Sequence, residues 1–185
     1  MELKTFKRYR MEIDLRQTAL EIPPLPQDYY VEPWSRSLLE AHATAHYLSF
    51  RDTPDATLFG NFQTFRGCRR VMENIFNRRN FLPAATHLIV YHPAESFHTE
   101  FVATIQGVLD AHGQGAIQNI GVVPNHQGKG LGKILLQLSL RGYQEWGVRI
   151  ANLEVTSDNT RALRLYSQTG FRITQVFYKA ATPRQ

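Results

Sequence analysis

The sequence predicts an α/β domain of the α+β kind, with a mixed, mostly antiparallel central sheet flanked by about four helices. Three apolar segments between residues 86 and 123 are separated by polar turns, which is typical of a meander of strands. From residue 124 a glycine-rich loop leads into two helix–strand pairs. The 185 residues, 43% hydrophobic and 20% charged, suffice for one buried core.

The N-terminal segment predicts a strand that stands apart from the rest. Residues 9–15 alternate between apolar and charged side chains, as in a half-buried strand. Three prolines between residues 22 and 26 then prevent regular structure. We therefore divide the chain into an N-terminal arm, residues 1–28, and a main domain, residues 29–180. The strand of the arm needs an edge to pair with, on its own domain or on a second copy, so a homodimer through this strand is one expectation.

The remaining elements follow in order. The patterns predict strands at Tyr29–Trp34, Thr86–Tyr91, Phe101–Leu109, Ala116–Val123, Asn152–Thr156 and Phe171–Tyr178. Helices are predicted over residues 35–50, residues 61–79, a segment from the glycine-rich loop to Gly147, and Asn159 to about Thr169. The third helix carries one apolar stripe of Leu131, Ile134, Leu135 and Leu138.

The loop Gln127-Gly128-Lys129-Gly130-Leu131-Gly132 predicts a site for an anion. Its glycines let backbone N–H groups approach a ligand at a helix start, where the helix dipole and Lys133 favour phosphate. The nucleotide-binding P-loop pattern fails, because Ile134 follows Lys133 where Ser or Thr is required. The dinucleotide pattern fails at Lys133, its sixth position. The loop alone is equally compatible with a tight structural turn.

Two blocks resemble the GNAT superfamily of N-acetyltransferases. Gln127, Gly130 and Gly132 satisfy its signature Gln/Arg-x-x-Gly-x-Gly/Ala, and residues 159–171 follow its pattern Asn-x-x-Ala-x-x-x-Tyr-x-x-x-Gly-Phe. Residues 116–173 are most similar to the bacterial enzymes that acetylate the N-terminal alanine of a ribosomal protein, whereas residues 1–85 show no clear likeness. The resemblance implies a GNAT fold with an extra N-terminal strand.

The resemblance also implies acetyl-CoA as co-substrate and indicates the residues that hold it. The expected cofactor-binding residues are Ile120, Gly121, Val122, Gln127, Gly128, Lys129, Gly130, Leu131, Gly132, Lys133, Asn159 and Tyr166. The N–H of Val122 would polarise the thioester carbonyl, in the manner of an oxyanion hole. Pro124 ends the pairing capacity of its strand, so we expect the sheet to splay there.

Direct transfer to an amine needs a base and an acid, for which Glu154 and Tyr166 are the candidates. Tyrosine stays protonated near neutral pH and can hydrogen-bond the leaving thiolate. Glu154 would accept the amine proton, directly or through a water held by Asn119. The structural alternatives are a core aromatic and a solvated glutamate. The expected acceptor is a primary amine of a small molecule, a protein N-terminus or a lysine, and the alternative function is a non-catalytic acyl-CoA-binding module.

Other features carry weaker expectations. His42 and His46 share a helix face without a third ligand, so no metal is expected. His126 could meet a phosphate, and the arginines around Cys68 could lower its pKa. The net charge of +5 contains no long basic run, so nucleic acid is not an expected partner. The polar start, the single cysteine and the lack of a long apolar run predict a cytoplasmic protein with no signal peptide and no membrane span.

Overall fold

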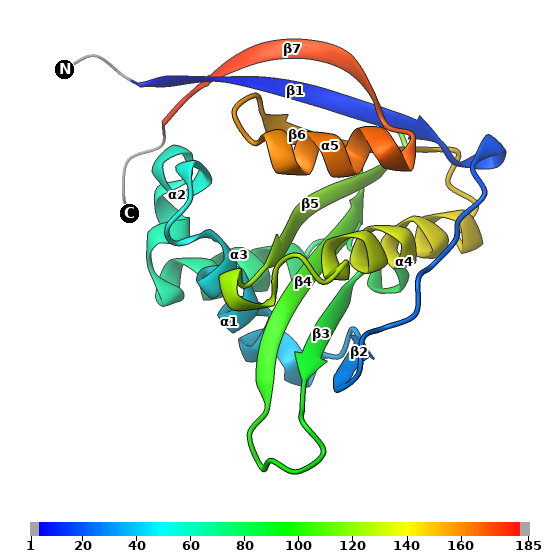
Figure 1. The fold of residues 1–185 in the computed structure, drawn as a ribbon. Helices are drawn as coiled ribbons and strands as arrows, with labels where there is room; N and C mark the ends of the chain where they lie inside the picture. The colour runs from blue at the N-terminus through cyan, green and yellow to red at the C-terminus, as the bar shows by residue number, and fades with distance from the viewer. Residues whose placement is uncertain (1–3, 182–185) are drawn as a thin grey trace.

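A computed structural model describes residues 4–181 as one seven-stranded sheet with helices on both faces (Figure 1). The strands lie in the order β2-β3-β4-β5-β6-β1-β7. Every neighbouring pair is antiparallel except β5 and β6, which confirms the mixed, mostly antiparallel sheet. The strands are β1 (Thr5–Asp14), β2 (Tyr29–Pro33), β3 (His87–Tyr91), β4 (Glu100–Leu109), β5 (Gly115–Val122), β6 (Ile150–Thr156) and β7 (Arg172–Ala180).

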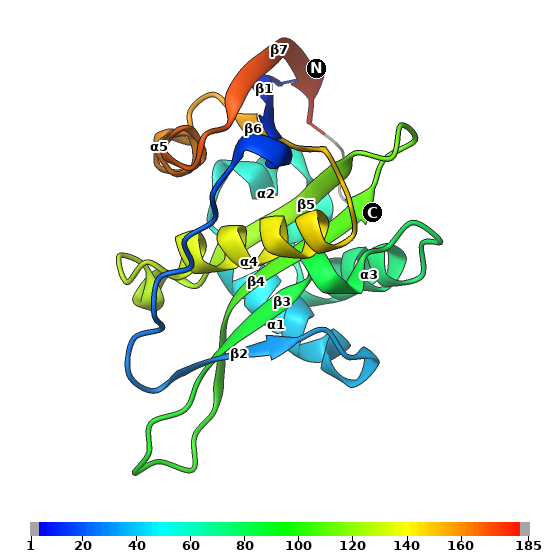
Figure 2. The same cartoon turned by 90° about the vertical axis from the view of Figure 1, so that its right-hand side faces the viewer.

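The helices form a layer on each side of the sheet. One layer holds α1, α2 and α3 and the other α4 and α5, as the two views at right angles show (Figures 1 and 2). Their bounds are α1 (Leu39–Phe50), α2 (Pro54–Leu58), α3 (Phe65–Phe76), α4 (Leu131–Glu145) and α5 (Thr160–Thr169). The short α2 is the one helix that was not predicted, because five residues are too few to show a helical period. Within residues 4–181 no helix has the length and apolarity needed to cross a bilayer.

The predicted N-terminal strand lies inside the sheet. β1 is inserted between β6 and β7, and over Arg8–Glu12 it has antiparallel partners on both sides. Met11 and Ile13, two apolar residues of the predicted alternation, are buried, and Phe6 is buried before the register shift between Arg10 and Met11. The strand thus finds the edge that it needs within its own chain, in the same sheet as the strands of residues 29–180. A homodimer through this strand stays a prediction.

The main core lies between the sheet and α4. The predicted stripe of α4 is confirmed: Leu131, Ile134 and Leu135 are at most 2% exposed, and Leu138 packs against the same cluster. Gly147, with φ of 82°, ends the helical segment as expected. This packing fixes the start of α4 against the end of β5, where the glycine-rich loop lies.

β5 and β6 separate early. They pair at only two positions, Gly115 with Ala151 and Ala116 with Asn152. β5 continues along β4 to Val122, while β6 continues along β1 to Thr156, so strand twist moves the two apart. The separation of the two strands that we expected at Pro124 therefore begins after Ala116, eight residues earlier. The proline is not its cause.

Candidate active site

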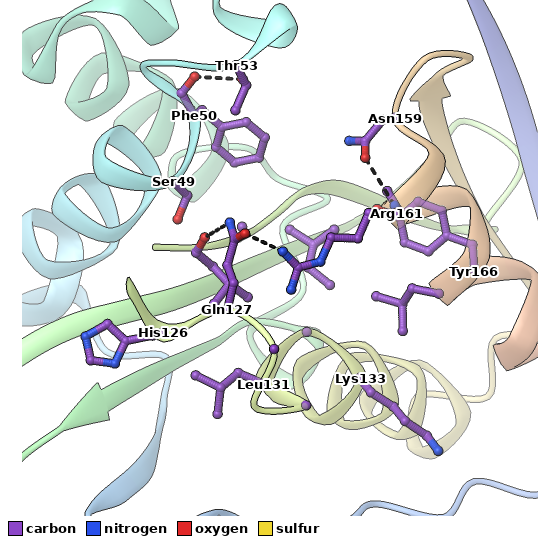
Figure 3. Close-up of a pocket in the computed structure, with 18 of the residues that line it drawn as sticks. Ser49, Phe50, Thr53, His126, Gln127, Leu131, Lys133, Asn159, Arg161 and Tyr166 are labelled. Carbon is purple, nitrogen blue, oxygen red and sulfur yellow. Dashed lines mark hydrogen bonds between the residues drawn. The ribbon is translucent and has the colours of Figure 1, made fainter. Parts of the chain in front are cut away.

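A cavity of about 450 Å³ lies where β5 and β6 diverge (Figure 3). Eleven of the twelve predicted cofactor residues line it: Ile120, Gly121, Val122, Gln127, Gly128, Gly130, Leu131, Gly132, Lys133, Asn159 and Tyr166. Lys129 is the exception; its side chain is exposed and does not line the cavity. The two sequence blocks, residues 127–132 and 159–171, thus face each other across one cavity.

The loop presents the start of α4 to this cavity. Gly128 and Gly130 both have φ of 80°, the left-handed region that favours glycine. A Cβ at either position would meet no atom within 4 Å, so glycine is needed there for backbone conformation and not for room. Gly130 is the N-cap of the 15-residue α4, whose first N–H groups are free to meet an anion.

The end of β5 directs a backbone amide into the gap between the diverging strands β5 and β6. Val123 donates its N–H to the carbonyl of Val102, at 2.8 Å, toward β4. Backbone groups of successive strand residues point to opposite sides, so the N–H and C=O of Val122 face away from β4, into the gap. The side chain of Gln127 donates to this carbonyl at 2.9 Å. The predicted orientation of the Val122 amide thus follows from the pairing of β5.

Arg161 is a cavity residue that the sequence analysis did not single out. Its guanidinium donates to the side-chain oxygen of Gln127 across the mouth of the cavity (Figure 3). It adds a second cation to the cavity, which Lys133 also lines. Its place within residues 159–171 was the only indication of it in the sequence. Further lining residues were also missed, because they come from residues 1–85, in which no motif had been identified: Ser49, Phe50, Thr53 and Asp55.

Asn159 and Tyr166 project from α5. The side-chain oxygen of Asn159 accepts from the N–H of Ala162 at 3.1 Å, which confirms the predicted helix cap. Tyr166 is 6% exposed. Burial raises the pKa of its hydroxyl well above the usual value; Asp55 raises it further, and Arg8 opposes this. Tyr166 therefore remains a proton donor across the physiological range.

Glu154 lies outside this cavity but is connected to it. It points to the opposite face from the buried Leu153 and Val155, as predicted, and lines a groove of about 400 Å³ beside α3. A smaller space of about 80 Å³, called the passage below, lies between the two and shares lining residues with each: Tyr166 lines both the passage and the cavity, and Glu154 lines both the passage and the groove. The candidate acid and base therefore face one passage from opposite ends.

The histidines play structural parts. His42 and His46 are fully buried on α1, and burial lowers their pKa values to about 3 and about 4. Over residues 4–181 no group of side chains has the make-up of a metal site. His126 is buried as well, with its ring nitrogens 2.8 Å from the Tyr29 hydroxyl and 3.3 Å from Glu100, although it also borders the cavity.

The expectation for Cys68 was wrong. Its side chain is fully buried in a small cluster with Ala56 and Phe62, and burial raises the pKa of the thiol to about 12. The neighbouring Arg69 instead pairs with Glu40 and, at 3.3 Å, with Glu73. The arginines of α3 therefore do not activate the Cys68 thiol, which is a core residue.

Comparisons with known proteins agree with this geometry. The model of the Acetyltransferase (GNAT) family matches residues 50–171. A mycothiol acetyltransferase of Frankia casuarinae is 30% identical over 179 residues, which cover 90% of this chain and 49% of that protein. The chain spans half or less of the length of the first curated relatives that it matches.

Two solved structures illustrate the shared fold. A GCN5-related N-acetyltransferase from Sphaerobacter thermophilus superposes with a TM-score of 0.68 at 22% identity, over 98% of this chain and 53% of that one. The ribosomal-protein alanine N-acetyltransferase of Escherichia coli superposes with a TM-score of 0.59 at 14% identity, over 85% of this chain and 96% of that one.

Proposed function

This chain belongs to the GNAT acetyltransferase family, and we propose that it transfers the acetyl group of acetyl-CoA directly to a primary amine. One observation carries the proposal: the passage shares lining residues both with the cavity that holds the family's two sequence blocks and with a second, polar groove. Such an arrangement lets two substrates meet from opposite sides of the sheet with their reacting atoms in one place.

The cavity has the features that a thioester cofactor requires. The exposed edge of β5 offers the Val122 amide to the acyl oxygen, and the free N–H groups of α4 suit a pyrophosphate. Lys133 and Arg161 add two cations at the same mouth. Acetyl-CoA supplies the activated acetyl group; the twelve residues predicted from the sequence would hold it, with Arg161 in addition and Lys129 only at the outer rim.

The proposed transfer is a single displacement. The neutral amine attacks the thioester carbonyl, the new C–N bond forms, and the C–S bond breaks. Glu154 takes the proton that the amine must lose, directly or through a water held by Asn119, which lines the same passage. Tyr166 hydrogen-bonds the departing thiolate from the cofactor side. The acid and the base act on different atoms, so neither needs to move during the reaction.

The groove favours a small, polar amine or the free end of a peptide. Its lining holds five side-chain amides beside Glu154: Asn61, Asn74, Gln118, Asn119 and Asn152. Such amides hydrogen-bond hydroxyls and peptide groups in either direction. The relatives' names add mycothiol-type amines to the acceptors worth testing, and the Escherichia coli structure adds peptides that begin with alanine. A cytoplasmic location, expected from the single cysteine, is part of this proposal.

The test is release of free thiol from acetyl-CoA in the presence of an amine panel. The panel should contain amino sugars, polyamines, free amino acids and short peptides with free N-termini. We expect acceptor-dependent release and a product whose mass is increased by one acetyl group. Tight binding of acetyl-CoA with no release over the whole panel would instead support the non-catalytic acyl-CoA-binding module.

A further inference from the structure

Behind the lining of the passage, a buried cation from a distant part of the chain contacts two of the residues that form it. Arg8 lies on β1, outside the residues that the family model matches, and is 5% exposed. Its side chain reaches the point where α2 approaches β6. A buried guanidinium is costly unless it is paired, so its partners indicate what it does there.

Arg8 connects two walls of the passage. Its Nη1 donates to the hydroxyl of Thr156 on β6 at 3.0 Å, and that hydroxyl donates to Oδ1 of Asp55 on α2 at 2.9 Å. The same Nη1 lies 3.6 Å from Asp55, and Nη2 lies 3.8 Å from Oε2 of Glu154. The guanidinium of Arg8 thus lies beside two carboxylates, that of Asp55 on α2 and that of Glu154 on β6.

Both carboxylates face the reacting groups. Asp55 borders the cavity and the passage, and Glu154 borders the passage and the groove. The guanidinium also lies 5.2 Å from the ring centre of Phe59, and Lys179 approaches the same ring from β7 at 4.7 Å. The positive charges of Arg8 and Lys179 together balance the negative charges of Asp55 and Glu154.

We propose that Arg8 is a positioning residue for acetyl transfer, which keeps Asp55 and Glu154 at the separation that lets an amine reach the thioester beside Tyr166. The inference rests on the proposed function. Without the cation, two carboxylates with a shared partner would repel each other and move the walls apart. The N-terminal strand, although distant in sequence from both family blocks, would then be a necessary part of the acceptor path.

The test compares Arg8→Met and Arg8→Lys with Arg16→Met. Arg16 follows β1 in the sequence, pairs with Asp14 at 3.0 Å and lines neither the cavity, the passage nor the groove. We expect Arg8→Met to lower kcat at least tenfold while the KM for acetyl-CoA changes less than twofold. Arg8→Lys keeps the positive charge but not the planar guanidinium with its several donors, and should recover part of kcat. Arg16→Met should leave kcat per folded molecule unchanged.

The possible outcomes separate the two proposals. If Arg8→Met and Arg8→Lys lose only thermal stability, with kcat per folded molecule equal to that of the wild type, Arg8 is structural and the inference fails. Should Arg8→Met not fold, Arg8→Gln takes its place, and a wild-type kcat per folded molecule in that uncharged variant would overturn the inference. An inactive wild-type protein over the whole amine panel would overturn the proposed function and this inference together.

Discussion

The side-chain amide of Gln127 donates a hydrogen bond to the carbonyl oxygen of Val122, at 2.9 Å, and so ties the glycine-rich loop to the end of β5. The backbone amide proposed to bind the acyl oxygen and the loop proposed to bind the pyrophosphate are therefore held at a fixed separation. Arg161 completes the connection to α5 through the other end of the same side chain.

Replacement of Gln127 should weaken cofactor binding. Gln127→Ala removes the hydrogen bond to Val122 and the one from Arg161. If cofactor binding loses about 1 kcal/mol in consequence, the Kd for acetyl-CoA should rise about fivefold. Gln127→Glu should be worse, since a carboxylate cannot donate to the Val122 carbonyl and places negative charge near a phosphate. Isothermal calorimetry with acetyl-CoA measures both values. Equal affinity in all three proteins would show that this contact does not shape the bound state.

Tyr166→Phe should slow turnover without weakening cofactor binding. Loss of a positioned proton donor typically costs about 10²-fold or more in rate, whereas the ring still fills its place beside Phe171. Tyr143→Phe is a matched control, because Tyr143 is fully buried and donates to the Val108 carbonyl at 3.2 Å, away from the cavity. Steady-state thiol release gives kcat for each variant. Unchanged kcat in Tyr166→Phe would remove this hydroxyl from the mechanism.

The buried His46 should make the fold sensitive to acid. Burial lowers its pKa from 6.5 to about 4, so the unfolded chain binds a proton more readily than the folded one. The stability contribution is complete above pH 6.5 and is lost as the pH falls toward 4, with a total of roughly 3 kcal/mol. His46→Leu should lose correspondingly less stability over this interval.

Urea unfolding at pH 7 and pH 4.5 measures this difference. The exposed His112 offers the control, and His112→Gln should keep the pH dependence of the wild type. The prediction is wrong if His46→Leu and the wild type lose the same free energy of unfolding on acidification.

Gly142 should be a position at which any side chain is harmful. A Cβ there would lie 1.9 Å from the carbonyl oxygen of Ala84, where α4 crosses close to the backbone before β3. Gly142→Ala should cost about 3 kcal/mol of unfolding free energy, because backbone must move to relieve the clash. In the same helix, a Cβ at Gly132 would meet Leu165 at an ordinary 3.5 Å. Gly132→Ala should therefore be neutral or stabilise by up to about 1 kcal/mol, as chemical denaturation can verify.

Local patterns in the sequence determined most of the secondary structure and many of the residues that line the cavity. Alternation predicted β1, a period of 3.6 predicted α4, and Gly147 marked the end of its helical segment, because each of these signals depends on near neighbours alone. The two motif blocks, with the resemblance that they carry, indicated eleven of the residues that line the cavity; Ile120, Gly121 and Val122 lie outside the blocks, on the strand before the loop.

Only the tertiary structure decided how distant segments meet. The place of β1 between β6 and β7, the early separation of β5 and β6, and the burial of Cys68 all depend on contacts between residues far apart in the chain. For the same reason, no pattern indicated that Asp55 lines one passage with Glu154 and Tyr166, or that Arg8 contacts both carboxylates from behind it. Strand pairing and helix packing bring these side chains together, and neither can be inferred from a local sequence pattern.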